Sequence, residues 1–280
     1  MNAVRASARP SPNADFALGL ARAYAGALIF GLPMYMTAEM WELGAHLPAW
    51  KLAVLPLLFF PFLIGLSWHA GFEPTFSWRD DVVDALVAFG VGITASAAML
   101  WLLKAMDGSS SLREEVGMVT LQSVPASIGA LLAQSQLGEQ PAGQALRGGV
   151  ERWSSEVFIM AVGALFLSFN MAPTEEMTAI AERVGPLQAL AIMGVSLALM
   201  HAFVYGVAFR GGAAGQEREP GWQLFLRFTV VGYAVALLLS AFMLWIFGSL
   251  AQLSLLAAVE TVAVLGLPAA LGAAAARLIL

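Results

Sequence analysis

Residues 26–40 read GALIFGLPMYMTAEM, and residues 163–177 read GALFLSFNMAPTEEM. The two stretches are identical at seven positions when they are aligned at a fixed offset of 137. Each starts within a long apolar run and ends on a threonine, a glutamate and a methionine. Internal repetition of this kind is a sign of duplicated structure. The two stretches therefore predict a chain that is built from two related halves.

Further matches follow in the same order along the chain, at offsets between 132 and 144. They pair His69-Ala70 with His201-Ala202, Met99-Leu-Trp101 with Met243-Leu-Trp245, and Pro125–Ala130 with Pro268–Ala273. Each match is weak by itself because Gly, Ala and Leu are common here, and coincidence among apolar helices is the alternative. The conserved order favours a duplication, with residues 18–138 as the first four-helix repeat and residues 139–280 as the second.

The composition places the chain in a membrane. Of its 280 residues 59% are hydrophobic and 12% are charged, whereas a soluble domain carries about 25% charged residues. Several apolar runs reach the roughly 20 residues that a helix needs to cross a bilayer. A backbone in lipid must satisfy its own hydrogen bonds, and the alternation of a β-barrel is absent, so these runs predict helices. The expected fold class is an all-α polytopic membrane protein.

We predict eight membrane spans, four in each half. They cover residues 18–41, 51–69, 82–105, 116–134, 156–173, 186–209, 223–247 and 253–276. The fourth span carries Gln122, Ser123 and Ser127, so it is expected to be an interior or re-entrant helix. Just before it, Ser111 and Glu114 have the spacing of a capping box at a helix start. Residues 1–17 are polar and rich in Pro and Ser, which predicts a disordered tail.

The basic residues indicate how the spans are oriented. With eight spans, ten Lys or Arg lie on the side of the two termini and four lie on the other side. This bias agrees with the positive-inside rule, so both termini are expected in the cytoplasm. Four spans per half is an even number, so the two halves should enter the membrane in the same direction. Such parallel repeats are related by a pseudo-twofold axis along the membrane normal.

Glu39 and Glu176 are the repeated acids, and Thr37 and Thr174 precede them by two residues. Both acids are expected at the outer ends of spans. One interpretation is structural, because a carboxylate near a helix end reaches headgroup water at little cost. The other is functional, because acids at the mouth of a pathway attract cations or exchange protons.

Two prolines are expected to break the spans that lead to these acids. Pro33 and Pro173 each free the carbonyl group four residues before them, and Asn170 lies beside the second break. A freed carbonyl at membrane depth needs protein, water or an ion as its partner. An ion ligand and an ordinary packing kink are both consistent with this pattern.

Two further residues could titrate within the membrane. Glu260 lies in the eighth span between apolar neighbours, and an acid in such a place faces the protein interior or a wet cavity. It is expected to be a buried, proton-exchanging group, and a protonated structural glutamate is the alternative. His201 lies in the sixth span and could relay protons, because histidine changes charge near neutral pH.

Several classes of function lack their sequence signals. The chain has no cysteine and only three histidines. It contains no His-Glu-x-x-His, Gly-x-Ser-x-Gly, P-loop or Rossmann pattern, and no basic block that would bind nucleic acid. We therefore expect no enzymatic activity, no cofactor, no metal site and no nucleic-acid partner.

Three segments carry a resemblance to known proteins. RAYAGALIFGLPMYMTAEMWELG (22–44), HAGFEPTFSWRDD (69–81) and LQSVPASIGALLAQSQLG (121–138) resemble an uncharacterised family of bacterial integral membrane proteins. The likeness covers most of the chain from Arg22 onward. It implies a multi-pass protein of the bacterial inner membrane with the lipid bilayer as its surroundings, and it carries no binding or catalytic residues over to this chain.

These observations lead to two hypotheses about function. The first is a channel or transporter for a small cation or a proton, with a pathway near the interface of the two halves. The second is a non-conducting membrane scaffold or sensor that acts through a partner protein, and a homo-oligomer is compatible with either. The residues expected along the pathway are Glu39, Glu176, Glu260, His201, Thr37, Thr174 and Asn170.

Overall fold

The computed structural model describes residues 12–70, 78–106, 108, 110–137, 149–211 and 221–279. These residues form helices and contain no strand. The helices of the first half are α1 (Pro12–Tyr35), α2 (Ala38–His46), α3 (Ala49–Ala70), α4 (Trp78–Leu102) and α5 (Leu112–Leu137). Those of the second half are α6 (Gly149–Met171), α7 (Glu175–Ala181), α8 (Pro186–Gly211), α9 (Gly221–Leu224), the π-helix η2 (Phe225–Val230), α10 (Val231–Phe247) and α11 (Leu255–Ile279).

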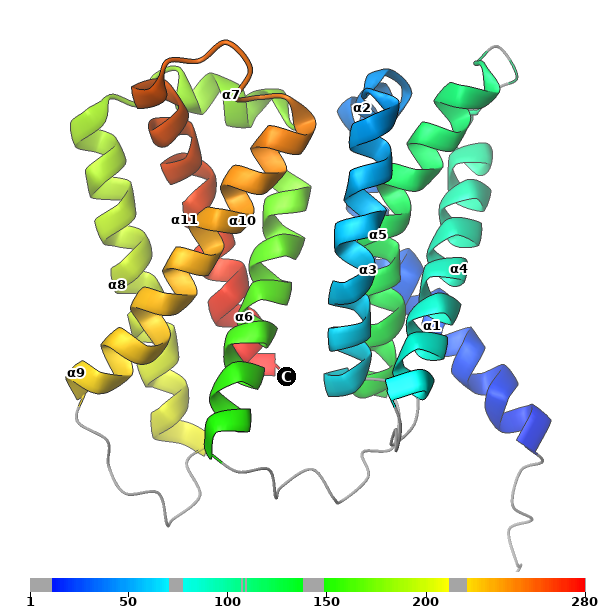
Figure 1. Ribbon diagram of the computed structural model, residues 1–280, viewed down its shortest axis with the longest axis horizontal. Helices are drawn as coiled ribbons and strands as arrows, with labels where there is room; N and C mark the ends of the chain where they lie inside the picture. The colour runs from blue at the N-terminus through cyan, green and yellow to red at the C-terminus, as the bar shows by residue number, and fades with distance from the viewer. Residues whose placement is uncertain are drawn as a thin grey trace, which may run out of the picture.

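Eight helical segments of the described residues are long and apolar enough to cross a membrane, which confirms the predicted count and the all-α fold class. They lie within α1, α3, α4, α5, α6, α8, η2–α10 and α11. Figure 1 shows the short helices α2 and α7 at one end of the bundle, and the start of α1 and the C-terminus at the other. We call these the α2–α7 end and the terminus end.

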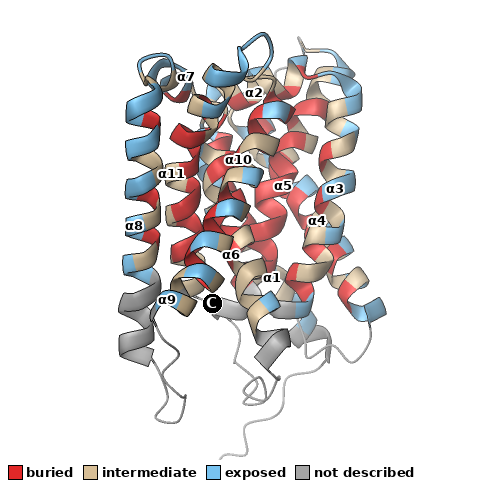
Figure 2. Cartoon of the chain, turned by 60° about the vertical axis from the view of Figure 1, so that its left-hand side comes forward, coloured by how far each residue is buried: buried red, intermediate tan, exposed pale blue. Residues whose placement is uncertain are grey.

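Each half is organised around its last long helix. Helix α5 packs against α1, α2, α3 and α4, and α11 packs against α6, α7, α8 and α10. Of the most apolar 18-residue stretch of the α5 span, 83% is buried, against 17% to 44% for the corresponding stretches of the other spans. Figure 2 shows this buried centre surrounded by helices whose outer faces are exposed. The prediction that the fourth span is an interior helix is therefore confirmed.

The start of α5 is fixed by the predicted capping box. The Ser111 backbone N–H donates to Glu114 Oε2 at 2.8 Å, and the Glu114 N–H donates to Ser111 Oγ at 3.4 Å. Two donors that the helix cannot satisfy are thus bonded by side chains.

The predicted ends of the first and fifth spans are wrong. Helix α1 ends at Tyr35, and the chain then starts a separate helix, α2, after the extended residue Thr37. Helix α6 ends at Met171, so Pro173 lies in the turn before α7 and not inside a helix. Of Pro33 and Pro173, Pro33 alone is inside a helix, as predicted. The sequence analysis predicted a disturbance at both prolines but not the short helices that follow, because nine and seven residues are too few to give a span-length apolar pattern.

The predicted tail falls mostly outside the described part of the chain. Residues 1–11 are not described, and α1 already begins at Pro12, within the predicted tail. The side chain of His69, one of the matched residues, also lies outside the described side chains.

Close helix crossings occur at matched glycines in the two halves. A Cβ added at Gly26 of α1 would overlap the carbonyl of Gly129 in α5, and one added at Gly163 of α6 would overlap the carbonyl of Gly272 in α11. Glycine at both positions lets the two backbones touch. Both pairs belong to the matched segments of the sequence. The shared contact supports the duplication, which stays a prediction.

Matched serines make a second shared contact. Ser96 of α4 hydrogen-bonds the Tyr35 hydroxyl of α1 at 3.2 Å, and Ser240 of α10 hydrogen-bonds Ser168 of α6 at 3.4 Å. All four residues are buried. The Tyr35 ring packs over Gly31, the position that aligns with Ser168 at the offset of 137. In the second half the serine pair bonds directly. In the first half Gly31 has no side chain to bond, and Tyr35, one turn later, bonds the matched serine instead.

Aromatic contacts join the two halves. Phe30 packs against Phe166 with ring centroids 5.1 Å apart, and Phe62 packs against Phe158 at 4.9 Å. Towards the α2–α7 end, Lys51 Nζ donates to the Trp245 carbonyl at 2.6 Å. The interface between the halves is therefore apolar over most of its depth.

Candidate functional site

The repeated glutamates lie in the first turns of the short helices. Glu39 is in the first turn of α2 and Glu176 in the first turn of α7, and both helices lie at the same end of the bundle (Figure 1). A carboxylate in a first turn is stabilised by the positive end of the helix dipole. The repeated acid therefore has a structural explanation in both halves.

The polar residues beside these acids are bonded within their own segments. Thr174 caps α7, accepting from the Met177 N–H at 3.3 Å, and also donates to the Met171 carbonyl at 3.0 Å. Thr37 donates to the Pro33 carbonyl at 2.5 Å. Asn170 Nδ2 donates to the Phe166 carbonyl at 2.8 Å. These bonds serve the helix ends that the sequence analysis did not predict.

Glu260 lies nearer the α2–α7 end than expected. It is the sixth residue of α11, about 8 Å from the start of that helix. Its side chain is half-buried rather than buried, and it makes no hydrogen bond or ion pair with the described residues. The neighbouring Thr261 is bonded within α11, to the Ala257 carbonyl.

The matched position in the first half explains why a glutamate fits here. Glu260 aligns with Gly117 of α5, where a Cβ would overlap the carbonyl of Gly44 in α2. Helix α7 ends at Ala181, and it contacts α11 much less than α2 contacts α5. Glu260 thus stands at the position that, in the first half, makes a close contact with the short helix α2.

Among the predicted site residues, His201 is the one whose side chain contacts residues of a neighbouring span. It lies on α8, towards the terminus end, and its Nδ1 is 3.0 Å from the Thr229 hydroxyl. Thr229 is fully buried. The ring of Phe225 packs edge-on against the imidazole, with centroids 5.1 Å apart. A polar group and an aromatic wall therefore fix the orientation of this histidine.

Both partners of His201 belong to the π-helix η2, at the start of the seventh span. A π-helix leaves backbone groups with altered partners, and such segments are frequent at functional sites. Here the Trp153 indole N–H from α6 donates to the Arg227 carbonyl at 3.1 Å. Side chains from two neighbouring helices thus hold the π-helical segment.

An ion pair between α6 and α11 packs against the π-helix η2, and it was not predicted as part of a site. Arg277 of α11 donates to Glu156 Oε2 of α6 through Nε at 2.9 Å and through Nη2 at 2.7 Å. The guanidinium also lies over the ring of Phe228 in η2, 4.2 Å from its centroid. Both charged side chains are about four-fifths buried. The sequence signal was the opposite charge at the terminus ends of the fifth and eighth spans.

Tyr233 and Ser196 form a layer of polar side chains, which we call the polar level, in the middle of the second half. The Tyr233 hydroxyl faces Ser196 of α8 and points towards Gly266 of α11, but it makes no hydrogen bond of regular geometry. Ser196 itself donates to the Ile192 carbonyl at 2.7 Å.

Two buried methionines lie beside Gly232, the residue before Tyr233. A Cβ added at Gly232 would overlap the terminal methyl groups of Met160 and Met200. Both methionines are fully buried. Because methionine is unbranched and flexible, these side chains can repack more easily than the alanines around them.

The second half therefore holds polar groups at three depths: His201 with Thr229 and Tyr233 with Ser196 lie between α8 and the η2–α10 span, and Glu260 lies on α11. Among the described residues no group of three or more His, Asp or Glu side chains could hold a metal ion. The arrangement suits proton exchange better than the binding of a bare cation, which needs several oxygen ligands.

The fold and these buried polar groups define a polytopic, all-helical integral membrane protein. Comparison with known proteins agrees with this class. The chain belongs to the family described as "Putative integral membrane protein (DUF2391)", whose model matches residues 19–280. Comparisons with curated proteins and with solved structures gave no match.

Proposed function

We propose that this protein moves protons across the membrane, through a pathway inside the second half. The observation that carries the proposal is the series of polar groups at successive depths on α8, on the η2–α10 span and on α11. Glu260 lies near the α2–α7 end, Tyr233 and Ser196 lie in the middle, and His201 with Thr229 lies towards the terminus end.

The chemistry of these groups favours protons over larger cations. Carboxyl, hydroxyl and imidazole groups both accept and donate protons, so they can pass a proton along a chain of hydrogen bonds. Histidine changes its charge between about pH 5 and 8, which suits a relay at physiological pH. A small cation remains the broader class to which this proposal belongs.

The interface between the halves is a poor route for charge. The pocket there has a volume of about 220 Å³ and is lined only by apolar side chains of α3, α5, α6 and α10. A charge at such a depth would find no polar partner, which is costly within a membrane. We therefore place the pathway within the second half and not between the halves.

The proposal includes an orientation. We place the protein in a bacterial inner membrane with both termini in the cytoplasm, which the bias of ten basic residues against four supports. Glu260 then lies near the periplasmic face and His201 nearer the cytoplasm.

Proton flux in liposomes tests the proposal. Purified protein is reconstituted with a pH-sensitive dye inside, and a potassium diffusion potential drives the flux. We expect the intact protein to acidify or alkalinise the lumen according to the sign of the potential. His201→Gln should reduce the rate at least about tenfold, because proton relays typically contribute factors of 10² or more.

The matched control is His46→Gln. His46 is exposed on α2, and its Nδ1 bonds the Glu42 carbonyl. This variant should keep the flux of the intact protein. Liposomes that stay tight to protons under both potentials would rule out transport, and equal flux in the two histidine variants would remove His201 from the pathway.

The two buried methionines, Met160 and Met200, which we call the methionine level, favour a second candidate function. It is a proton sensor that does not conduct protons across the membrane. Met160 and Met200 are fully buried, and their terminal methyl groups lie beside Gly232, the residue before Tyr233, while Met200 directly precedes His201 in α8. If this level stays closed, protonation of His201 would change only the packing of η2, and the signal would pass to a partner protein. Tight liposomes combined with pH-dependent hydrogen exchange in residues 225–230 would support this candidate.

A further inference from the structure

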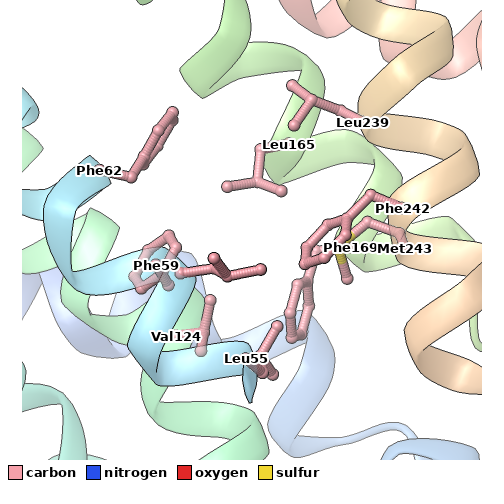
Figure 3. A pocket seen from close by; sticks show the side chains of 10 residues that line it. Leu55, Phe59, Phe62, Val124, Leu165, Phe169, Leu239, Phe242 and Met243 are labelled. Atoms are coloured by element: carbon pink, nitrogen blue, oxygen red, sulfur yellow. The ribbon is translucent and has the colours of Figure 1, made fainter. Parts of the chain in front are cut away.

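We propose that the apolar pocket between the two halves binds one acyl chain of an anionic phospholipid, whose phosphate is held by Lys51. The pocket lies between the spans of α3 and α10, with α6 at its back (Figure 3). This site is independent of the proton pathway, which lies within the second half.

The lining of the pocket matches a hydrocarbon chain. Figure 3 shows Phe59 and Phe62 facing Leu165, Leu239 and Phe242 across it, with no nitrogen or oxygen atom among the side chains shown. The residues on α3 extend from Leu55 to Phe62, about 10 Å along the helix.

The volume of the pocket limits what can occupy it. It holds about 220 Å³ and is partly open to the surroundings, whereas pockets for drug-sized ligands measure about 300–1,000 Å³. It therefore has room for a chain segment and not for a whole lipid. Protein interiors leave few voids of this size, and the surrounding bilayer supplies chains that can fill this one.

A positive charge stands at the α2–α7 end of the pocket. Lys51 lies one turn before Leu55 on α3 and reaches across to the carbonyl of Trp245 on α10, so it spans the two walls. Only one of its three protons is used in that bond. Two protons can therefore be donated to a phosphate.

Two indoles flank the ammonium group as expected at a membrane interface. Lys51 Nζ lies 5.7 Å from the ring centroid of Trp50 and 5.6 Å from that of Trp245. Both tryptophans are about half exposed, and Trp245 packs on the pocket residue Phe242. Tryptophan and lysine at headgroup level, above an apolar groove, match the two parts of a phospholipid.

Photo-crosslinking of the intact chain tests the site directly. The protein is reconstituted in vesicles that contain phosphatidylglycerol with a diazirine in the acyl chain, and the labelled residues are identified by mass spectrometry. We expect labels on the pocket residues of α3, α6 and α10. Phosphatidylcholine with the same chain should label them less, and inorganic phosphate in excess should not compete.

Substitution of Lys51 tests the headgroup contact. In native mass spectrometry, Lys51→Gln should lower the retention of phosphatidylglycerol about fivefold relative to phosphatidylcholine. Lys104→Gln is the matched control, because Lys104 is an exposed lysine beyond the end of α4. Leu165→Phe, which puts a ring into the pocket, should reduce chain labelling without changing Lys51.

Three results would overturn the proposal. They are labels confined to other helices, equal phosphatidylglycerol retention in the Lys51 and Lys104 variants, and protein–protein crosslinks at the pocket, which would show a second copy there instead of lipid. Because the crosslinking uses the unchanged chain, loss of folding in a variant does not leave the question open.

Discussion

Single residues decide how closely the helices of each half approach one another. Where both partners are glycine, as at Gly26 with Gly129 and at Gly163 with Gly272, the backbones touch. Where glycine is replaced by glutamate, as at Glu260, the short helix α7 stands further from its long partner. A glycine at such a position lets two helices touch, whereas a glutamate keeps them apart and adds an acidic group.

The glycine crossings give a prediction about stability. Gly26→Ala and Gly163→Ala should each destabilise the protein by about 1–3 kcal/mol, because the new methyl group overlaps a backbone carbonyl that cannot move easily. Thermal unfolding in detergent measures the effect. Gly90→Ala and Gly194→Ala are the controls, because open space surrounds both positions. Controls as unstable as the test variants would contradict the predicted crossings.

The buried methionines give a prediction about transport. Met200→Ala should lower stability by about 2–5 kcal/mol, because a fully buried side chain is truncated. The same change should raise proton flux, because water can enter the space that the side chain leaves beside Gly232. Flux per folded molecule in liposomes measures the second effect. A flux that falls together with stability would show that the methionine level is not the barrier.

At the scale of elements, the short helices α2 and α7 explain the motif that the sequence repeats. Thr37 and Thr174 stand directly before them, the glutamates lie in their first turns, and Met40 and Met177 are buried beneath them. The motif therefore specifies the start of a helix that lies outside the spans.

Helix capping gives a prediction that separates structure from transport. Thr174→Ala should cost about 1 kcal/mol, because the Met177 N–H loses its acceptor. Glu176→Gln should cost about 0.3–1 kcal/mol through the lost dipole interaction and should leave proton flux unchanged. Unfolding and flux are measured on the same preparations. A large loss of flux in Glu176→Gln would return this acid to the pathway.

Long apolar patterns could be predicted from the sequence, and short breaks could not. The eight spans follow from hydropathy alone, and the interior position of α5 follows from polar residues such as Gln122 and Ser127. The prolines beside the breaks were recognised, but the helices α2 and α7 after them were not predicted, because they are too short to give a span-length pattern. His201 was found as a titratable residue within a span.

The contacts between the residues of the site could not be predicted from the sequence, for a physical reason. The ion pair of Glu156 with Arg277 joins residues 121 positions apart, and each of them alone is an ordinary charge at the end of a span. The π-helix η2 depends on its neighbours from α6 and α8 and has no local signal. Glu260 was predicted to lie deep within the membrane, whereas it lies near the start of α11. The difference arises because hydropathy does not show where a helix enters the membrane.

At the scale of the whole molecule, the two halves share a fold but differ in their interiors. Both have a central last helix, a glycine crossing and a buried serine link. Among the residues that the structure describes, the second half alone combines a polar level at Tyr233 with a π-helix and a histidine. We infer that the first half serves as a structural partner and that the second half carries the pathway.

Paired tyrosine variants test this claim most directly. Tyr233→Phe and Tyr35→Phe each remove one buried hydroxyl group, the first from the proposed pathway and the second from the Ser96 contact of the first half. Proton flux in liposomes should fall at least about tenfold in Tyr233→Phe and stay within about twofold of the intact protein in Tyr35→Phe. Unchanged flux in Tyr233→Phe, or an equal loss in both variants, would contradict a pathway through the second half.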